Sequence, residues 1–261
     1  MSTSVRRGPP GPAAVARLVG LAALCLVAGC EARTNAADEL KADDAGPFPA
    51  ADRPVASIVS TRWSTEEARD RVNEADRVMD RAGIRPGMTV ADIGAGEGYY
   101  TIRLAQRVGA DGRVLAEDII PATRDALAER VTRERLDNVS VRLGLPADPR
   151  LPENSFDRIL MVHMYHEIEE PYAFLWRMRP SLRPDGRVIV VDADRPTQNH
   201  GTPPALLRCE FAAVGYALVD LQPMASAGGY MATFRVAGPR PDPAAIKACR
   251  MPGQGRVPQG S

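Results

Sequence analysis

The sequence predicts an α/β domain built on a doubly wound, mostly parallel sheet, and three observations lead to this fold class. Between about residues 88 and 192, short apolar runs alternate with segments of helical periodicity. The runs are apolar throughout, as expected for strands of a parallel sheet that helices cover on both faces. A turn with three glycines, residues 94–98, directly follows the first run, at the place where such sheets bind ligands.

An amphipathic helix is expected ahead of the sheet. Ser64 and Glu67 have the spacing of a capping box. Apolar residues then recur at helical intervals from Ala68 to Ala82, and Gly83 follows as a stop signal.

Five parallel strands and their connecting helices come next. The strands are expected at residues 88–93, 113–118, 139–143, 156–162 and 187–192. The helical segments between them include residues 101–108, 123–135 and 172–182. Beyond the fifth strand the rhythm changes: residues 205–224 predict a helix and then a strand, and residues 228–237 predict a strand that can pair with it in antiparallel fashion.

The N-terminus has the features of an export signal. Arg6 and Arg7 precede an apolar segment at residues 18–29, which is shorter than the roughly 20 residues of a membrane-spanning helix and suits a signal-peptide core. The segment ends in Val-Ala-Gly-Cys, which resembles the lipobox of bacterial lipoproteins, with Cys30 as the lipidated residue. The resemblance implies a lipoprotein on the periplasmic face of a bacterial membrane. A general secretory signal, leaving a soluble periplasmic protein, is the alternative.

Composition divides the chain into four parts. We expect a signal peptide at 1–29, a disordered tether at 30–60, the main domain at 61–238 and a Pro/Gly-rich tail at 239–261. The chain contains 33 Lys+Arg and 33 Asp+Glu, so no bulk charge favours nucleic acid as a partner. In an oxidising compartment Cys209 and Cys249 either pair or stay as two separate thiols.

The glycine turn has a spacing that distinguishes between ligands. The dinucleotide fingerprint is G-x-G-x-x-G, whereas here the glycines are Gly94, Gly96 and Gly98, and Tyr99 occupies the place of the fingerprint's third glycine. Asp92 lies two residues before the first glycine. A helix that begins near Tyr99 would direct free backbone amides toward an anionic group.

The ordered set of motifs resembles the class I S-adenosylmethionine-dependent methyltransferases, most closely those of the quinone-biosynthesis type. The motifs are D-x-G-x-G-x-G, the acidic pair that closes the second strand, LPENSFDRIL, HMYHEI, LRPDGRVIVVD, and the late pair AVGYALVD and GGYMATFRV. The resemblance covers roughly residues 71–236. It implies a Rossmann-like sheet with an antiparallel last strand, S-adenosylmethionine as cofactor and a small-molecule acceptor.

The resemblance also assigns residues to the cofactor. Asp92, Gly94, Ala95 and Gly96 would hold the methionine end. Asp118 would accept from the ribose hydroxyls, with Glu117 as the alternative in register. Either Asp148, on a shifted loop, or the backbone would meet the adenine amine. This chain departs from the family in having Gly-Leu-Pro-Ala-Asp after the third strand, where members often have Gly-Asp-Ala.

Methyl transfer is an in-line displacement that depends chiefly on alignment and on exclusion of water. A base is needed only when the nucleophile starts protonated. His163 and His166, after the fourth strand, are the candidate catalytic residues, because histidine titrates near neutrality. Asp192 and Asp194 end the fifth strand and face the same crevice, although such acids are commonly solvated.

No metal is expected from H-x-x-H-E at residues 163–167, because two histidines three apart on a turn need not converge and no third ligand is evident. Two classes of function remain open at this point. One is an S-adenosylmethionine-dependent methyltransferase. The other is an exported, non-catalytic ligand-binding lipoprotein on the same fold.

Overall fold

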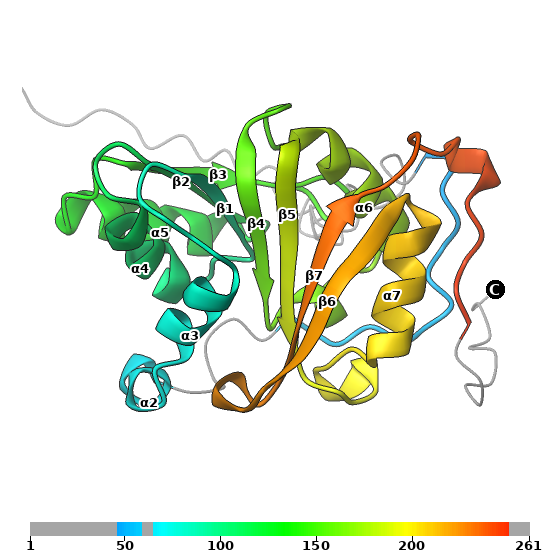
Figure 1. Ribbon diagram of the computed structural model, residues 1–261, viewed down its shortest axis with the longest axis horizontal. Helices are drawn as coiled ribbons and strands as arrows, with labels where there is room; N and C mark the ends of the chain where they lie inside the picture. Colours follow the sequence, from blue (N-terminus) through cyan, green and yellow to red (C-terminus); the bar gives the residue numbers. More distant parts are fainter. Residues whose placement is uncertain (1–45, 59–64, 251–261) are drawn as a thin grey trace, which may run out of the picture.

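The computed structural model describes residues 46–58 and 65–250. The strands in these ranges form one seven-stranded sheet in the order β3-β2-β1-β4-β5-β7-β6 (Figure 1). Strands β1 to β5 are parallel, and β7 runs antiparallel between β5 and β6. The strand bounds are β1 Thr89–Ile93, β2 Arg113–Asp118, β3 Val139–Leu143, β4 Phe156–Val162, β5 Leu182–Asp192, β6 Tyr216–Met224 and β7 Gly229–Val236. The predicted Rossmann-like fold with an antiparallel last strand is confirmed.

Helices cover both faces of this sheet (Figure 1). Their bounds are α2 Glu66–Arg71, α3 Glu74–Arg81, α4 Tyr99–Val108, α5 Pro121–Arg133, α6 Pro171–Met178 and α7 Pro204–Ala213. Along β5, Ile189 and Val191 pack in the same core cluster as α3 and α4. Val188 and Val190 pack with α6 and α7 on the opposite face. Each such buried side chain contributes about 1.5–3 kcal/mol, which explains why the central strands are apolar throughout.

The single helix predicted ahead of the sheet is two helices, α2 and α3. Thr65 caps α2, and its Oγ1 accepts the N–H of Ala68 at 3.2 Å. The chain then breaks at Asn73, which has a left-handed backbone with φ 52°, a conformation that asparagine tolerates better than most residues. The break lets Glu74 enter the protein at the start of α3, where it is 4% exposed. Helical periodicity continues across the break and therefore does not reveal it.

Residues 46–58 pack against the domain and form no disordered tether. Arg53 donates from Nε to Glu210 Oε1 at 2.9 Å, and both side chains are fully buried. The backbone N–H of Ala56 donates to the carbonyl of His166 at 3.2 Å. The predicted tether over 30–60 is therefore wrong for its described part. An ion pair between residues 157 positions apart leaves no trace in local composition.

The C-terminal segment is also fixed as far as residue 250. A disulfide joins Cys209 of α7 to Cys249, and the N–H of Cys249 donates to the Tyr172 hydroxyl at 2.6 Å. The described domain thus extends beyond the predicted 61–238. Within the described ranges, no helix has the length and apolar character that crossing a membrane requires. The predicted signal peptide at 1–29, Cys30 and the last residues of the predicted tail, 251–261, lie outside the described residues.

Candidate active site

A cleft of about 1210 Å³ opens where the parallel strands end. Its volume exceeds the roughly 300–1,000 Å³ of an ordinary small-molecule pocket, so it has room for two molecules. We distinguish two parts by their lining. The glycine-loop half is lined by residues 94–97, residues 117–120 and Pro146, and the histidine half by residues 162–164, residues 166–169, Ala193 and His200.

The glycine loop after β1 needs its glycines for backbone conformation. Gly94, Gly96 and Gly98 have φ angles of 65°, 56° and 90°, which side chains with a Cβ rarely adopt. The carboxylate of Asp118 holds this loop in place. Its Oδ2 accepts the N–H of Gly96 at 3.0 Å, and its Oδ1 accepts the N–H of Ile120 at 2.9 Å. Burial raises the pKa of Asp118 despite these two amide hydrogen bonds.

Glu117 lies beside Asp118 and also lines the cleft. It is 1% exposed, and its Oε1 has no hydrogen-bond partner. Burial, together with the neighbouring Asp118 charge, raises the pKa of Glu117 to about 8. Gly144 closes over it so tightly that a Cβ there would lie 1.6 Å from Glu117 Oε1. The raised pKa favours the protonated form of Glu117 at pH 7.

Two of the predicted cofactor residues lie outside the cleft lining. Asp92 is buried beneath the loop, where the Thr101 hydroxyl donates to it at 2.6 Å, and burial raises its pKa to about 6. Its place supports a role in fixing the loop to α4. The carboxylate of Asp148 accepts the N–H of Arg150 at 2.7 Å and shapes its own turn. Pro146, from the same turn, is the residue that lines the cleft.

His163, at the end of β4, faces the cleft and a buried acid. It has a left-handed backbone, φ 57°, and its Nε2 lies 3.6 Å from Glu74 Oε1. Glu74 also accepts from Arg69 at 2.6 Å and from the Tyr100 hydroxyl at 3.0 Å. Burial alone would raise the pKa of Glu74, but the hydrogen bonds from His163 and Arg69 outweigh it and lower the pKa to about 2. His163 is therefore anchored to an ionised partner.

His166 lies in the short turn after β4, the 3₁₀ helix η1 Tyr165–Glu167, and it has a different partner. Its Nδ1 is 3.0 Å from the carboxylate of Asp192, which ends β5. Asp192 is fully buried, and it accepts further hydrogen bonds from the Thr202 hydroxyl at 2.7 Å and the Ala193 N–H at 2.8 Å. Since a carboxylate only accepts, Nδ1 of His166 is the donor in this contact. Asp194, by contrast, is exposed.

His200 is a residue of the histidine half that sequence reasoning missed. It follows the 3₁₀ turn η3 Thr197–Asn199, beyond the end of β5, and lines the same cleft as His166. The two rings meet edge to face with their centroids 5.5 Å apart. The only sequence signal was a lone histidine in a loop after a strand, which by itself predicts nothing about its partners.

Comparison with known proteins shows a similarity to methyltransferases over part of the chain. Residues 90–186, from β1 into β5, match a family model described as a methyltransferase domain. This stretch contains the glycine loop, both acids that end β2, and His166. It does not contain Asp192 or His200, which complete the histidine half.

Individual proteins show the same similarity. The chain is 37% identical over 114 residues to nocamycin O-methyltransferase from Saccharothrix syringae. The aligned stretch covers 44% of this chain and 41% of that one. The chain is also 32% identical over 126 residues to the ubiquinone/menaquinone biosynthesis C-methyltransferase UbiE from Hahella chejuensis, covering 46% and 48% of the two chains. A SAM dependent methyltransferase from Aquifex aeolicus has a similar structure, with a TM-score of 0.56 and 22% identity over 66% of this chain and 97% of that one.

The match of residues 90–186 agrees with the predicted type of domain, and the structural similarity confirms the predicted fold. The name of the Aquifex aeolicus protein records SAM, the cofactor that the sequence predicts here. The chain spans about half the length of the curated relatives it matches. Their names record methyl acceptors at oxygen and at carbon, so the acceptor does not follow from similarity.

Proposed function

We propose that the protein is an S-adenosylmethionine-dependent methyltransferase acting on a small molecule. One observation carries the proposal. The D-x-G-x-G-x-G loop after β1 is hydrogen-bonded to the acid that closes β2, at the edge of a sheet where the strand order reverses. The family match of residues 90–186 supports the same conclusion.

The glycine-loop half fits the cofactor. When bound, S-adenosylmethionine supplies a methyl group on a positively charged sulfur. Gly94, Ala95 and Gly96 offer a backbone that a ligand can approach closely, and we assign them to its methionine end. Glu117, with its unpartnered Oε1, is the acid that we assign to the ribose hydroxyls, while Asp118 fixes the loop.

The histidine half fits the methyl acceptor. The side chain of His166 lines the cleft, and its contact with Asp192 orients the ring. We assign His166 to activation of the acceptor, and His163, whose Nε2 lies 3.6 Å from Glu74, to its orientation. Met164, Ile168 and Phe174 provide apolar lining that excludes water from the reacting atoms. Oriented groups of this kind favour catalysis over simple capture of a ligand.

Titration calorimetry of the full chain tests this proposal, with S-adenosylmethionine, S-adenosylhomocysteine and NAD as ligands. We expect both sulfur nucleosides to bind and NAD not to bind. Gly94→Ala should weaken binding, because the new Cβ would lie 3.0 Å from the Met164 side chain at the edge of the cleft. Gly109→Ala is the matched control: its φ of 68° is equally unfavourable, but no atom lies within 4 Å of the new Cβ. A folded protein that ignores both nucleosides contradicts the proposal.

We further propose that the protein is exported and anchored through lipid on Cys30. The apolar segment at residues 18–29 and the Val-Ala-Gly-Cys sequence support this. The disulfide between Cys209 and Cys249 is an independent argument, since such bonds persist in oxidising compartments.

A further inference from the structure

We propose that His166, Glu167 and His200 form a binding site for a zinc ion in the histidine half of the cleft. The sequence predicted no metal, because no third ligand was evident beside H-x-x-H-E. In the structure, His163 lies near Glu74 and is not part of the group. His200, from the loop after β5, is the third member beside His166 and Glu167. The ligand set is therefore split between two segments 33 or more residues apart in sequence.

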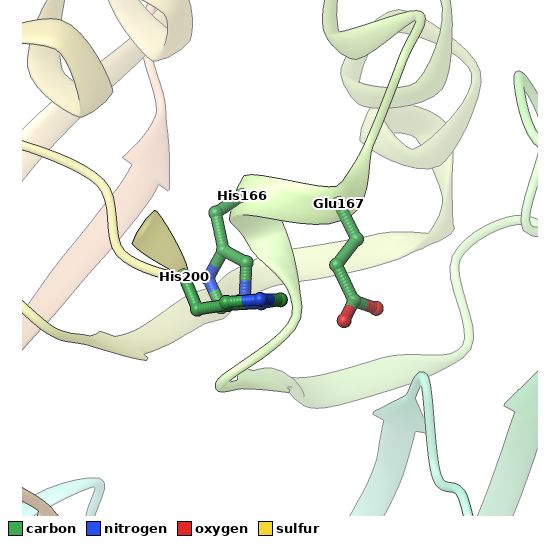
Figure 2. A group of neighbouring side chains, drawn as sticks. All are labelled: His166, Glu167 and His200. Atoms are coloured by element: carbon green, nitrogen blue, oxygen red, sulfur yellow. The ribbon is translucent and has the colours of Figure 1, made fainter. Parts of the chain in front are cut away.

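The three side chains converge. One ligand atom from each of the three residues lies within 4.8 Å of those of the other two. Figure 2 shows that His166 and Glu167 extend to the same side of η1, and that the His200 ring lies across the end of His166. Zinc holds nitrogen and oxygen ligands at about 2.0–2.2 Å, so small side-chain rotations bring the three atoms into a coordination sphere.

His166 is prepared as a ligand. His166 lines the cleft, but its side chain is only 2% exposed. Its Nε2 is buried and has no hydrogen-bond partner. A buried ring nitrogen without a partner is costly, so it indicates a ligand. The bond from Nδ1 to the Asp192 carboxylate fixes the ring, and this histidine–carboxylate pairing is the usual arrangement around metal-bound histidine.

The loop that carries His200 is held at both ends. Thr197 is fully buried, and its hydroxyl donates to the carbonyl of Pro54. Thr202 is also fully buried and donates to Asp192, the same carboxylate that orients His166. Asp192 thus connects both histidine-bearing segments, so the spacing of the two imidazoles is set by buried contacts.

Two imidazoles and one carboxylate are a ligand set of catalytic zinc sites, in which three protein ligands leave a fourth position open. The open position here would face the cleft, because all three residues line it. Borderline nitrogen ligands disfavour Mg²⁺ and Ca²⁺, which prefer oxygen.

The zinc ion also suggests the chemical class of the methyl acceptor. This suggestion rests on the proposed methyl transfer, whereas the proposal that zinc binds is independent of it. A hydroxyl oxygen at the open position would release its proton to bulk water more readily. That oxygen would then form the new bond to the methyl carbon. The methyl–sulfur bond breaks in the same step, and its electron pair stays on sulfur as a neutral thioether. The acceptor would accordingly be an alcohol or a phenol.

Metal binding is tested on the full chain without any cofactor. The protein is treated with chelator, any free thiol is alkylated, and Zn²⁺ is added in a calorimetric titration, with bound zinc measured by atomic emission. We expect one ion per chain. Loss of a residue that only hydrogen-bonds to a metal ligand weakens metal binding by about 10–100-fold. His200→Ala removes a ligand itself, so it should weaken zinc binding by more than this. His163→Ala is the matched control, since it removes a cleft histidine outside the trio, and it should bind zinc as the wild type does.

Two further variants secure the interpretation. Asp192→Asn should weaken zinc binding by about 10–100-fold. If His200→Ala does not fold by circular dichroism, Glu167→Gln takes its place. The visible absorption of the Co²⁺-loaded protein should change with each ligand variant. Failure of the folded wild type to bind zinc overturns the proposal. Zinc affinity as high as that of the wild type in the His200 or Glu167 variant also overturns it. So does a loss of affinity in the His163 variant as large as that in the ligand variants. A parallel titration with S-adenosylmethionine tests the proposed function separately.

Discussion

Replacing Glu117 with glutamine should make the free energy of unfolding less dependent on pH between about pH 5 and 8. In the folded protein the pKa of Glu117 is raised to about 8 by burial and by Asp118, against an ordinary value of 4.5. Between these pH values the folded state keeps a proton that the unfolded state has released. The free energy of unfolding of the wild type therefore falls by about 1.4 kcal/mol for each unit of rising pH in this window. Glu117→Gln removes this loss, because the amide does not titrate.

The size of the effect follows from the window. From about pH 5.5 to 7.5 the stability difference between Glu117→Gln and the wild type should grow by about 3 kcal/mol in favour of the variant. Urea unfolding followed by circular dichroism at three pH values measures it. Glu97→Gln, in the exposed part of the glycine loop, controls for the amide replacement itself. A difference that stays constant with pH would refute the inference that Glu117 is protonated at neutral pH.

Three more predictions concern the ends of the chain. Cys209→Ser should lower the free energy of unfolding by about 2–4 kcal/mol, measured in urea, while S-adenosylmethionine binding persists, because the bond to Cys249 lies away from the cleft. Glu210→Gln should cost about 3–5 kcal/mol in the same assay, because it leaves the Arg53 guanidinium buried without its counter-ion, and an unchanged stability would contradict the role of this pair. Cys30→Ser should shift the protein from the membrane fraction to the soluble fraction and abolish incorporation of labelled fatty acid, and retention in the membrane would argue against a lipid anchor on this residue.

The sheet could be predicted from sequence because its strands are apolar on both faces. The predicted bounds of β2, β3 and β4 agree with the structure, and β5 begins earlier, at Leu182, because its first residue pairs with β4 across a bulge. The break at Asn73 was not predictable, since the apolar positions on both sides of it keep the same period. Residues 46–58 were missed because their order depends on contacts far away in sequence, such as Arg53 with Glu210.

The site was predictable in part for a similar reason. The glycine loop and the β2 acids are close in the chain and have a recognisable spacing, so their position in the cleft could be anticipated. The division of roles between Glu117 and Asp118 depends on which amides each carboxylate meets. Asp192 was expected as a strand-end acid that is commonly solvated, yet it is buried against His166 and Thr202. Convergence of His166 with His200 requires the fold itself.

The most direct test of the central claim is a crystal structure of the protein with S-adenosylhomocysteine. We predict that the homocysteine part lies along residues 94–96 and that the ribose hydroxyls contact Glu117, with the sulfur directed toward the histidine half of the cleft. Density for the nucleoside at any other place, or a cleft that stays empty under saturating ligand, would contradict the account.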